Sequence, residues 1–248
     1  MRALLLAAGL GARLRPITND IPKCLVPIAG QPLLQYWLDM LFKNGIERVL
    51  INTHYLSNKV EEFVAESPWR SSIDLVFEES LLGTGGTLRL NRAFFDGHAG
   101  ILAHADNLSR FQPAAFIARH NQRPAGIEIT MMTFEADHPS ECGIVAENER
   151  GIVTGFFEKV ENPPGTRANG AVYIFEPSII EFLGSMDKNF IDLSTEVLPH
   201  YLGRMQTYFN NDYHRDIGTP ENLGRAETDY TATTIGSKIN VGNRQNHD

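Results

Sequence analysis

A continuous apolar segment that ends in a glycine turn is the feature that most constrains how this chain folds. Residues 2–8 form the apolar run, and Gly9 and Gly11 follow it in the stretch LLLAAGLGARLRP. A run without a polar face is typical of a parallel strand that is buried on both sides of a sheet. The glycines let backbone N–H groups approach a phosphate, because no Cβ stands in the way. The segment therefore predicts an α/β sheet with an anion-binding loop after its first strand.

Strand and helix signals alternate over the first hundred residues. Apolar residues recur at helical spacing from Gln31 to Asn44, and Asn44-Gly45 supplies a stop signal. The later elements expected in this half are a strand at 47–53, a helix at 57–66, a strand at 73–78, a helix at 84–95 and a strand at 100–106. This alternation predicts right-handed βαβ units and a Rossmann-like, doubly wound sheet.

The pattern changes about halfway along the chain. Four strand-like segments, IEITMMTF, CGIVAE, GIVTGFFEK and GAVYIF, follow one another too closely for crossover helices. Two helical patterns follow near 177–183 and 194–202, and a last helix begins with Thr219 as N-cap and Pro220 at the first helical position. We therefore expect a mixed sheet in which a β-rich half is added to the first. The tail 230–248 is expected to be loosely ordered.

Composition argues against several classes of partner. The chain has 248 residues, a formal net charge of -8 and a pI near 5.5. A protein that grips a nucleic-acid backbone usually carries a basic stripe, so we expect no nucleic-acid partner. No segment approaches the roughly 18 to 20 apolar residues that span a bilayer, so we expect no membrane partner and a cytoplasmic protein. A homo-oligomer is compatible with the sequence, which leaves the oligomeric state open.

Two common phosphate-binding motifs fail in the glycine loop. The dinucleotide fingerprint needs a third glycine and an acid about twenty residues on, and GLGARLRP does not match it. The P-loop needs Gly-Lys-Ser/Thr, which neither this loop nor residues 82–87 contain. What remains is a loop charged by Arg13, with Lys23 ten residues later, a combination suited to a triphosphate. The alternative is an ordinary turn with incidental arginines.

At these residues the sequence resembles a family. LLLAAGLGARLRPIT followed by PKCLVPIAGQPLL is similar to the signature of the sugar-1-phosphate nucleotidylyltransferases, G-x-G-[T/A]-R-[L/M]-x-P-L-T and then P-K-x-[L/M]-x-P-[I/V]. The resemblance implies the nucleotide-diphospho-sugar transferase type of fold. It implies that Arg13 and Lys23 are catalytic and act at the triphosphate. The loop residues expected to bind the nucleotide are Leu6, Ala8, Gly9 and Gly11.

A second segment resembles the family's base-binding stretch. ESLLGTGGTL, residues 79–88, is similar to E-x-x-L-G-T-[A/G]-G-[A/S]-L, which implies nucleotide contacts from Gly83, Thr84 and Gly85. We expect the glycines to form a flat backbone wall with exposed N–H and C=O groups. Glu79, or its neighbour Glu78, can accept from the two adjacent donors of guanine, which slightly favours GTP. The alternative is a solvated glutamate pair at a strand end.

Two aspartates are candidates for a Mg²⁺ site. Asp106 follows the fourth strand, at the sheet edge where open α/β folds bind ligands, and resembles the family's metal-binding aspartate. YHRDIGTPENL resembles W-x-D-[I/V]-G-T-P-E-x-[L/Y], which makes Asp216 the second ligand, although Asp216 could instead merely cap a turn. Mg²⁺ needs only one or two protein carboxylates when it also binds phosphates. His104-x-Asp106 suggests a transition-metal pair, but no third ligand of that kind is nearby.

The remaining motifs resemble the family's sugar-binding half. CGIVAENERGIVTGFFEKVENPP is similar to Y-G-[V/I]-V followed by E-K-P, and RANGAVYIFEP is similar to [N/A]-x-G-x-Y-[V/I]-F-x-P. The sugar-phosphate contacts implied are Gly143, Glu158, Lys159, Asn169 and Gly170. Cys142 and Val160 depart from the usual tyrosine and proline. Lys159 could instead be an exposed lysine that pairs with a neighbouring glutamate.

The sequence thus predicts an enzyme that joins an NTP and a sugar 1-phosphate into an NDP-sugar and pyrophosphate, with Mg²⁺ as cofactor. We expect one domain over residues 1–229, with a nucleotide half at about 1–110 and a sugar half at about 111–229, of the family's short type. GTP with mannose or manno-heptose 1-phosphate is slightly favoured over uridylyl or thymidylyl transfer. A catalytically silent, NDP-sugar-binding regulatory subunit is the alternative of another class.

Overall fold

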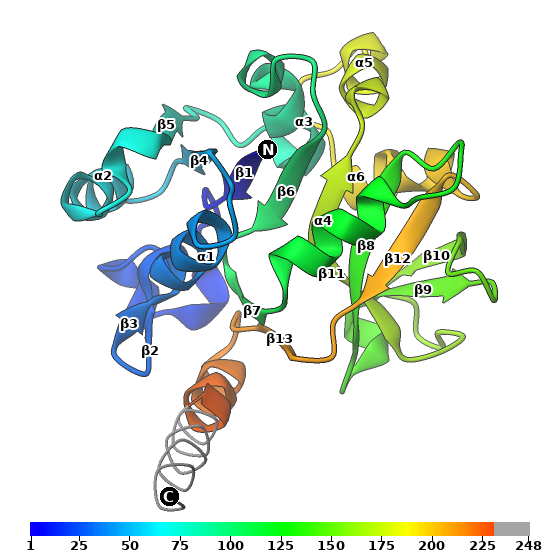
Figure 1. Ribbon diagram of the computed structural model, residues 1–248. Coiled ribbons are helices and arrows are strands. Elements are labelled where there is room, and N and C mark those ends of the chain that lie inside the picture. Colours follow the sequence, from blue (N-terminus) through cyan, green and yellow to red (C-terminus); the bar gives the residue numbers. More distant parts are fainter. Residues whose placement is uncertain (231–248) are drawn as a thin grey trace, which may run out of the picture.

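A mixed sheet organises the part of the chain that the structure, a computed structural model, describes, residues 1–230 (Figure 1). Its strand order is β10-β9-β11-β6-β1-β4-β5, and β8 pairs with β11 and with β12. The strands are β1 (Arg2–Leu6), β4 (Arg48–Thr53), β5 (Ile73–Phe77), β6 (Gly100–His104), β8 (Ile129–Glu135), β9 (Gly143–Glu147), β10 (Val153–Glu158), β11 (Arg167–Phe175) and β12 (Met205–Phe209). Two further ribbons pair β2 (Pro27–Ile28) with β3 (Gln31–Pro32) and β7 (Asn107–Arg110) with β13 (Tyr213–Asp216).

Strand β6 joins the two halves of this sheet. It pairs in parallel with β1, and β1 and β4 continue the parallel arrangement to β5. On its other side β6 pairs antiparallel with β11, which in turn pairs antiparallel with β8 and β9. The expected doubly wound, mixed α/β sheet is therefore confirmed, and the carboxyl end of β6 lies where its two halves meet.

Two apolar layers cover the faces of the sheet. The helices that pack on them are α1 (Leu33–Phe42), α2 (Ser57–Glu66), α3 (Gly83–Leu90), α4 (Pro113–Asn121), α5 (Pro177–Ser185) and α6 (Leu193–Glu196). Trp37 of α1, Val60 of α2 and Phe116 of α4 belong to one buried cluster. Leu88 of α3 and Leu183 of α5 belong to the other. Because strand side chains alternate between faces, the apolar strands fill both layers.

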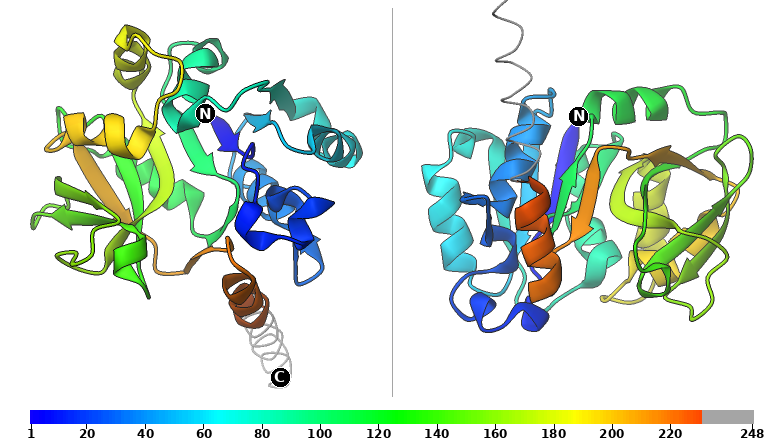
Figure 2. Two further views of the ribbon diagram at one scale, coloured as in Figure 1. Left: turned by 180° about the vertical axis from the view of Figure 1, so that it is seen from behind. Right: turned by 90° about the horizontal axis from the view of Figure 1, so that it is seen from below.

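The last helix connects the metal-candidate strand to the first half of the chain. Residues 220–230 are helical, and Thr219 Oγ1 accepts from Asn222 N at 3.2 Å, so the predicted N-cap is confirmed. Glu227 Oε2 accepts from Ala29 N at 2.8 Å. Figure 2 shows this helix beside the first, blue segments of the chain. The expected tail 230–248 lies outside the described residues except for Tyr230, which is helical and contacts the Tyr36 ring.

Several boundaries differ from those expected. The helix predicted at 84–95 is split into α3 and a 3-10 turn at Arg92–Phe95. The helix predicted at 194–202 is α6 followed by a 3-10 turn at Leu198–Tyr201 that contains a proline in its first turn, where proline interrupts α-helical hydrogen bonding. The sequence analysis did not predict β7, α4, β12 or β13. Among residues 1–230 no helix is long and apolar enough to cross a bilayer.

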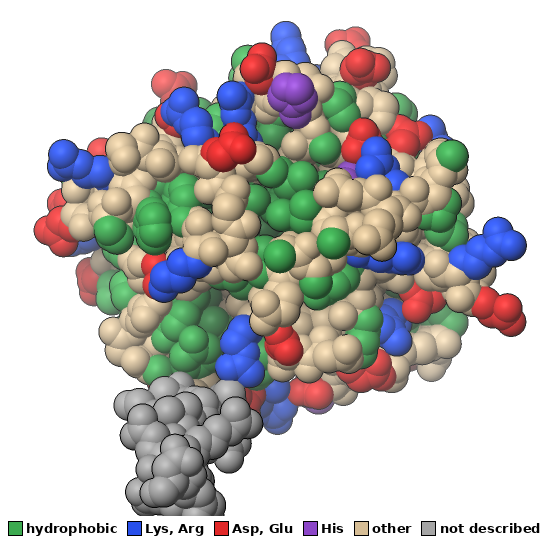
Figure 3. Space-filling model, in the orientation of Figure 1, with side chains coloured by type: hydrophobic (Ala, Val, Ile, Leu, Met, Phe, Trp, Pro, Cys, Tyr) green, Lys and Arg blue, Asp and Glu red, His purple; other side chains and the backbone are tan. Residues whose placement is uncertain are grey.

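Charged side chains are interspersed on the visible face of the molecule. In Figure 3, Lys and Arg side chains lie among Asp and Glu side chains rather than in a single stripe. The formal charge of -8 thus coexists with local cation–carboxylate pairs. A binding site for an anionic ligand on such a surface must be built locally.

Candidate active site

The glycine loop after β1 is shaped by one close contact. Gly11 has φ +60, and a Cβ there would lie 2.9 Å from Thr18 Cγ2. Thr18 Oγ1 also donates to Gly11 O at 2.7 Å. Only glycine fits this conformation and this packing without strain. The loop therefore folds back on its own 3-10 turns and carries Arg13 toward Asp216, with 3.3 Å between the Arg13 Nη2 and Asp216 Oδ2 atoms.

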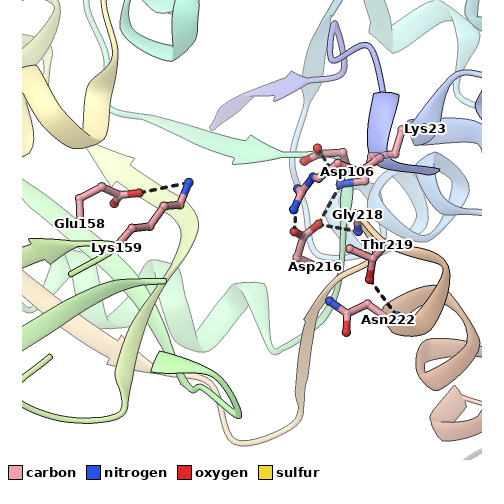
Figure 4. Close-up of polar contacts among 9 residues, drawn as sticks. Lys23, Asp106, Glu158, Lys159, Asp216, Gly218, Thr219 and Asn222 are labelled. Carbon is pink, nitrogen blue, oxygen red and sulfur yellow. Dashed lines mark hydrogen bonds and ion pairs between the residues drawn. The ribbon is translucent and has the colours of Figure 1, made fainter. Parts of the chain in front are cut away.

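Lys23 lies between the two candidate metal ligands. Its Nζ is 2.9 Å from Asp106 Oδ2 and 2.8 Å from Asp216 Oδ1 (Figure 4). Asp106 follows β6, Asp216 ends β13, and Gly218 N also donates to Asp216 Oδ1 at 2.8 Å. Three segments far apart in sequence therefore meet at the carboxyl edge of the parallel strands. The structure brings together Arg13, Lys23, Asp106 and Asp216 as the sequence predicted.

The charges of this cluster support one another. Burial lowers the pKa of Lys23, but the carboxylates of Asp106 and Asp216 outweigh burial and raise this pKa above its ordinary value. Burial raises the pKa of Asp216, but Lys23 and Arg13 outweigh it and hold that pKa below its ordinary value. Lys23 therefore stays a cation and Asp216 stays an anion near neutral pH.

A cavity of about 270 Å³ opens beside this cluster. It lies at the carboxyl ends of β1, β4 and β6, where parallel sheets bind ligands. Its lining contains the predicted nucleotide residues Leu6, Ala8, Gly9, Gly83 and Thr84, together with Asn52, Glu78, Leu81, Thr87, His104, Asp106 and Phe190. The cavity thus combines an apolar wall with a few convergent polar groups, which is typical of a small-molecule site.

Glu78, rather than Glu79, is the glutamate in the cavity wall. Glu79 is exposed and does not line the cavity, whereas Glu78, the alternative named beside it, does line it. Glu78 is buried and accepts from Asn52 Nδ2 at 3.0 Å and from Thr87 Oγ1 at 2.5 Å. Val76 of β5 packs against the apolar layer that contains α3. Because side chains alternate along a strand, Glu78, two residues later, lies on the same face of the sheet as Val76. The adjacent residue therefore points away.

The glycines of the GTGG segment pack against the chain near Ile191. A Cβ on Gly83 would lie 2.5 Å from Ile191 O, and one on Gly85 would lie 2.7 Å from Ile191 Cγ2. The N–H groups of Gly85 and Gly86 both donate to Ile191 O, at 2.9 and 3.3 Å. The expectation that Gly85 exposes its N–H to a base is therefore wrong. Close packing of α3 on residues 189–191 requires these glycines.

Glu158 and Lys159 lie across from the Lys23 cluster (Figure 4). Lys159 follows the end of β10, its side chain is 67% exposed, and its Nζ is 3.6 Å from Glu158 Oε1. A Cβ on Gly143 would lie 2.6 Å from Glu158 Oε2, so this glycine makes room for the Glu158 carboxylate. Lys159 has φ +50, which directs the chain out of the strand immediately after Glu158. Lys159 thus pairs with the neighbouring Glu158, as the alternative expected from the sequence has it, while most of its side chain is exposed.

Asn169 and Gly170 form an irregular turn within β11. The register between β11 and β8 shifts between Asn169 and Tyr173. Asn169 Oδ1 accepts from Ala171 N at 3.0 Å, and Asn169 Nδ2 donates to Tyr173 Oη at 2.6 Å. A Cβ on Gly170 would lie 2.6 Å from Met132 Cε. The bulge fixes Asn169 through its own strand and leaves one carbonyl lone pair of its amide for a further contact.

Two histidines lie near the cluster, of which the sequence analysis considered His104 only as half of a transition-metal pair and did not consider His214. His104 ends β6 and lines the cavity, and burial lowers its pKa. His214 of β13 forms a hydrogen bond of 2.7 Å between its Nδ1 and Ser109 Oγ. Its ring centroid is 4.3 Å from that of Phe134, and burial lowers its pKa to about 4. Position 214 corresponds to the tryptophan of the quoted W-x-D motif, a signal that could have marked His214. Both imidazoles are therefore neutral near pH 7.

The fold and this cluster define a mixed α/β protein with a carboxylate–lysine site at the edge of its parallel strands. The chain belongs to the nucleotidyl transferase family, whose sequence profile it matches over residues 2–233. It is 32% identical over 232 residues to the mannose-1-phosphate guanylyltransferase of Mycobacterium tuberculosis (strain ATCC 25618 / H37Rv), an alignment that covers 92% of this chain and 64% of that protein. The chain thus spans less than two thirds of the length of the curated relatives it matches.

Solved structures share this fold. The structure of HddC from Yersinia pseudotuberculosis complexed with GMP-PN has a TM-score of 0.77 and 25% sequence identity, and the match covers 92% of this chain and 99% of that chain. A Bacillus anthracis structure in complex with a sucrose, described provisionally as a glucose-1-phosphate thymidylyltransferase, has a TM-score of 0.84, 19% identity and coverages of 92% and 94%. At this lower identity the second match shows the fold alone.

Proposed function

We propose that this chain transfers a nucleotidyl group from an NTP to a sugar 1-phosphate, which yields an NDP-sugar and pyrophosphate. The observation that carries the proposal is the position of Lys23, bound to Asp106 and Asp216 at the carboxyl edge of the parallel strands. Asp106 of this cluster lines the cavity at β1, β4 and β6, and the Lys159 side chain lies across from the cluster. The family and the mannose-1-phosphate guanylyltransferase relative support this reaction class.

The reaction needs charge stabilisation and positioning rather than a protein base. A phosphate oxygen of the sugar 1-phosphate is already anionic near neutral pH, and it attacks the α-phosphorus. The bond from that phosphorus to the bridging oxygen breaks, and pyrophosphate leaves with the electron pair. Arg13 and Lys23 stabilise the charge that develops at the triphosphate, and Lys159 orients the attacking phosphate. The residues proposed to contact the nucleotide precede those proposed to contact the sugar phosphate in the sequence. This order supports a nucleotide half at about 1–110 and a sugar half at about 111–229 within one unit, 1–229.

The cluster fits a divalent cation. Asp106 and Asp216 offer hard carboxylate oxygens that converge on one point, now held by the Lys23 ammonium group, and both side chains are partly exposed. Among residues 1–230 no group of three His, Cys, Asp or Glu side chains is arranged to hold a metal. The two carboxylates suit Mg²⁺, which takes few protein ligands and fills its shell with water and phosphate oxygens. Bound between Asp106 and Asp216, Mg²⁺ would supply positive charge at the reacting phosphates.

Guanine is the base that the cavity supports best. The Glu78 carboxylate lies in the cavity wall and can accept from two adjacent donors, which guanine presents and uracil and thymine do not. The relative's name and the GMP-PN complex point the same way. We therefore propose GTP as nucleotide and mannose or a manno-heptose as the sugar of the 1-phosphate. We place the reaction in the cytoplasm, where NTPs are made.

Pyrophosphate release tests this function. The purified chain is incubated with Mg²⁺, each of the four NTPs and a series of sugar 1-phosphates that includes mannose, manno-heptose, glucose and N-acetylglucosamine. We expect the fastest release with GTP and a manno-configured sugar. Fastest release with UTP or dTTP and another hexose would overturn the base assignment but keep the reaction class. Silence across the matrix, together with NDP-sugar binding, would instead indicate a regulatory subunit.

A further inference from the structure

His104 lines the cavity, and the reaction proposed above gives it no role. It is the last residue of β6 and is only partly exposed. Within residues 1–230 neither of its ring nitrogens has a hydrogen-bond partner. In the same range the one fully buried side-chain N or O atom without a partner is Gln206 Oε1. The His104 nitrogens therefore face the cavity rather than packed protein.

The sheet register places His104 in a row with the cavity floor. Leu6 of β1 pairs with Asn52 of β4 on one side and with His104 of β6 on the other. Glu78 extends the row, because it accepts from Asn52 Nδ2 at 3.0 Å. All four residues line the cavity. Since neighbouring strands lie about 4.8 Å apart, His104 stands about 10 Å from Asn52 along this row.

The ends of the row differ in chemistry. In the proposed function Glu78 accepts from the base, whereas Asp106, two residues beyond His104, contacts Lys23, which is assigned to the phosphates. A nucleotide links its base to its phosphates through ribose. The Glu78 carboxylate reaches back to Asn52, so that carboxylate lies about two strand spacings, or about 10 Å, from His104. This distance is comparable to the span from the pairing edge of a purine to its ribose hydroxyls. The group that reaches His104 from such a nucleotide is therefore the ribose.

We propose that His104 forms a hydrogen bond with a ribose hydroxyl of the bound nucleotide, so that this chain selects ribonucleotides over deoxyribonucleotides. The inference rests on the proposed function for the class of ligand, a nucleoside triphosphate. A site built to bind a hydroxyl rejects the analogue that lacks it, because its polar group is then left without a partner. His104 would thus be a specificity residue of the nucleotide half, although it stands on the strand that joins both halves.

Equilibrium binding measures this preference without requiring turnover. GTP and UTP are each titrated beside their 2′-deoxy and 3′-deoxy forms into the wild type, His104→Leu and His104→Gln. We expect the wild type to bind one deoxy form about three- to tenfold more weakly than the ribonucleotide, the effect of one neutral hydrogen bond. His104→Leu should reduce that ratio to about one, and His104→Gln should restore part of it. His98→Ala, an exposed histidine outside the cavity, should keep the wild-type ratio.

The outcomes separate this inference from the function on which it rests. Equal binding of ribo and deoxy forms by the wild type, or an unchanged ratio in a folded His104→Leu variant, would show that His104 does not read the ribose. A changed preference among sugar 1-phosphates at a constant ribose ratio would assign His104 to the sugar and contradict the proposal. If no pyrophosphate is released but the preference for ribonucleotides is intact, only the proposed reaction is contradicted. No binding of any nucleotide would overturn both.

Discussion

Lys23 Nζ and Asp216 Oδ1 lie 2.8 Å apart although 193 positions separate the two residues in the sequence. The contact joins the loop after β1 to the strand β13 that precedes the last helix. Because Asp106 contacts the same nitrogen from the end of β6, one lysine holds two carboxylates that would otherwise repel each other. The site is therefore complete only when the chain between its first and last elements is folded.

Replacement of Lys23 tests this arrangement. We expect Lys23→Met to reduce pyrophosphate release by about 10²- to 10³-fold, because a group that stabilises developing charge is lost. The pKa of Asp216 should rise in this variant, since Lys23 is the partner that lowers it most. Lys43→Met is the matched control, because Lys43 forms an exposed pair with Asp39. Similar losses in both variants would show that Lys23 has no special role.

Glu78 and Glu79 form a natural pair of test and control. We expect Glu78→Gln to weaken the use of GTP by about 10- to 100-fold, because a carboxylate that accepts two hydrogen bonds becomes an amide with one acceptor. Glu79→Gln should leave the kinetics with GTP unchanged, since Glu79 is exposed. Steady-state kcat/KM values for GTP and UTP measure the effect. A loss of kcat/KM for GTP that is confined to Glu79→Gln would assign the base contact to Glu79 instead of Glu78.

We expect opposite effects from two glycine substitutions, one in the GTGG segment and one in α5. Gly85→Ala should destabilise the fold by about 1 to 3 kcal/mol, because its Cβ would overlap Ile191. Gly184→Ala in α5 should stabilise the fold by up to about 1 kcal/mol, since no atom lies within 4 Å of its Cβ and alanine favours a helix. Urea unfolding measures both free energies. Equal effects would contradict the packing explanation for Gly85.

His120 predicts that stability falls at mildly acidic pH. Burial lowers the pKa of His120, and the Glu176 hydrogen bond opposes this effect only in part, while Arg123 adds to it. As pH falls below about 6.5, the unfolded chain binds a proton that the folded chain does not, so the free energy of unfolding decreases. The decrease continues until pH reaches the lowered pKa of the folded state. His120→Asn should reduce the slope of the unfolding free energy between pH 7.5 and 5, to which His104 and His214 also contribute, and an unchanged slope would contradict this assignment.

The motifs in the sequence predicted what depends on local pattern. The buried strand β1, the glycine loop and Asp106 follow from apolar runs and strand ends, and Thr219 follows from a capping signal. The sequence left Glu78 and Glu79 as alternatives, because a shift of one residue at the end of a strand moves a side chain to the opposite face. Gly85 was assigned the wrong surroundings because its contact, Ile191, comes from a loop that no local pattern places beside α3.

Short strands and sheet register are harder to predict from the sequence. β12 and β13 are 5 and 4 residues long, and β13 is only partly buried along its length, so neither shows a long apolar period. The position of His104 beside Leu6 depends on the register of β1 and β6, which hydrogen bonding between distant segments sets. The sequence could therefore identify the members of the site more readily than their mutual arrangement.

The central claim is that Asp106 and Asp216 hold the charge that the nucleotidyl transfer requires. The most direct measurement is Mg²⁺-dependent pyrophosphate release from GTP and mannose 1-phosphate by the wild type and by Asp106→Asn, with thermal unfolding to confirm that the variant is folded. The account predicts release by the wild type that stops when Mg²⁺ is removed, and a folded variant whose release is at least about 10²-fold slower. A folded Asp106→Asn variant that turns over at a rate near the wild type would contradict it.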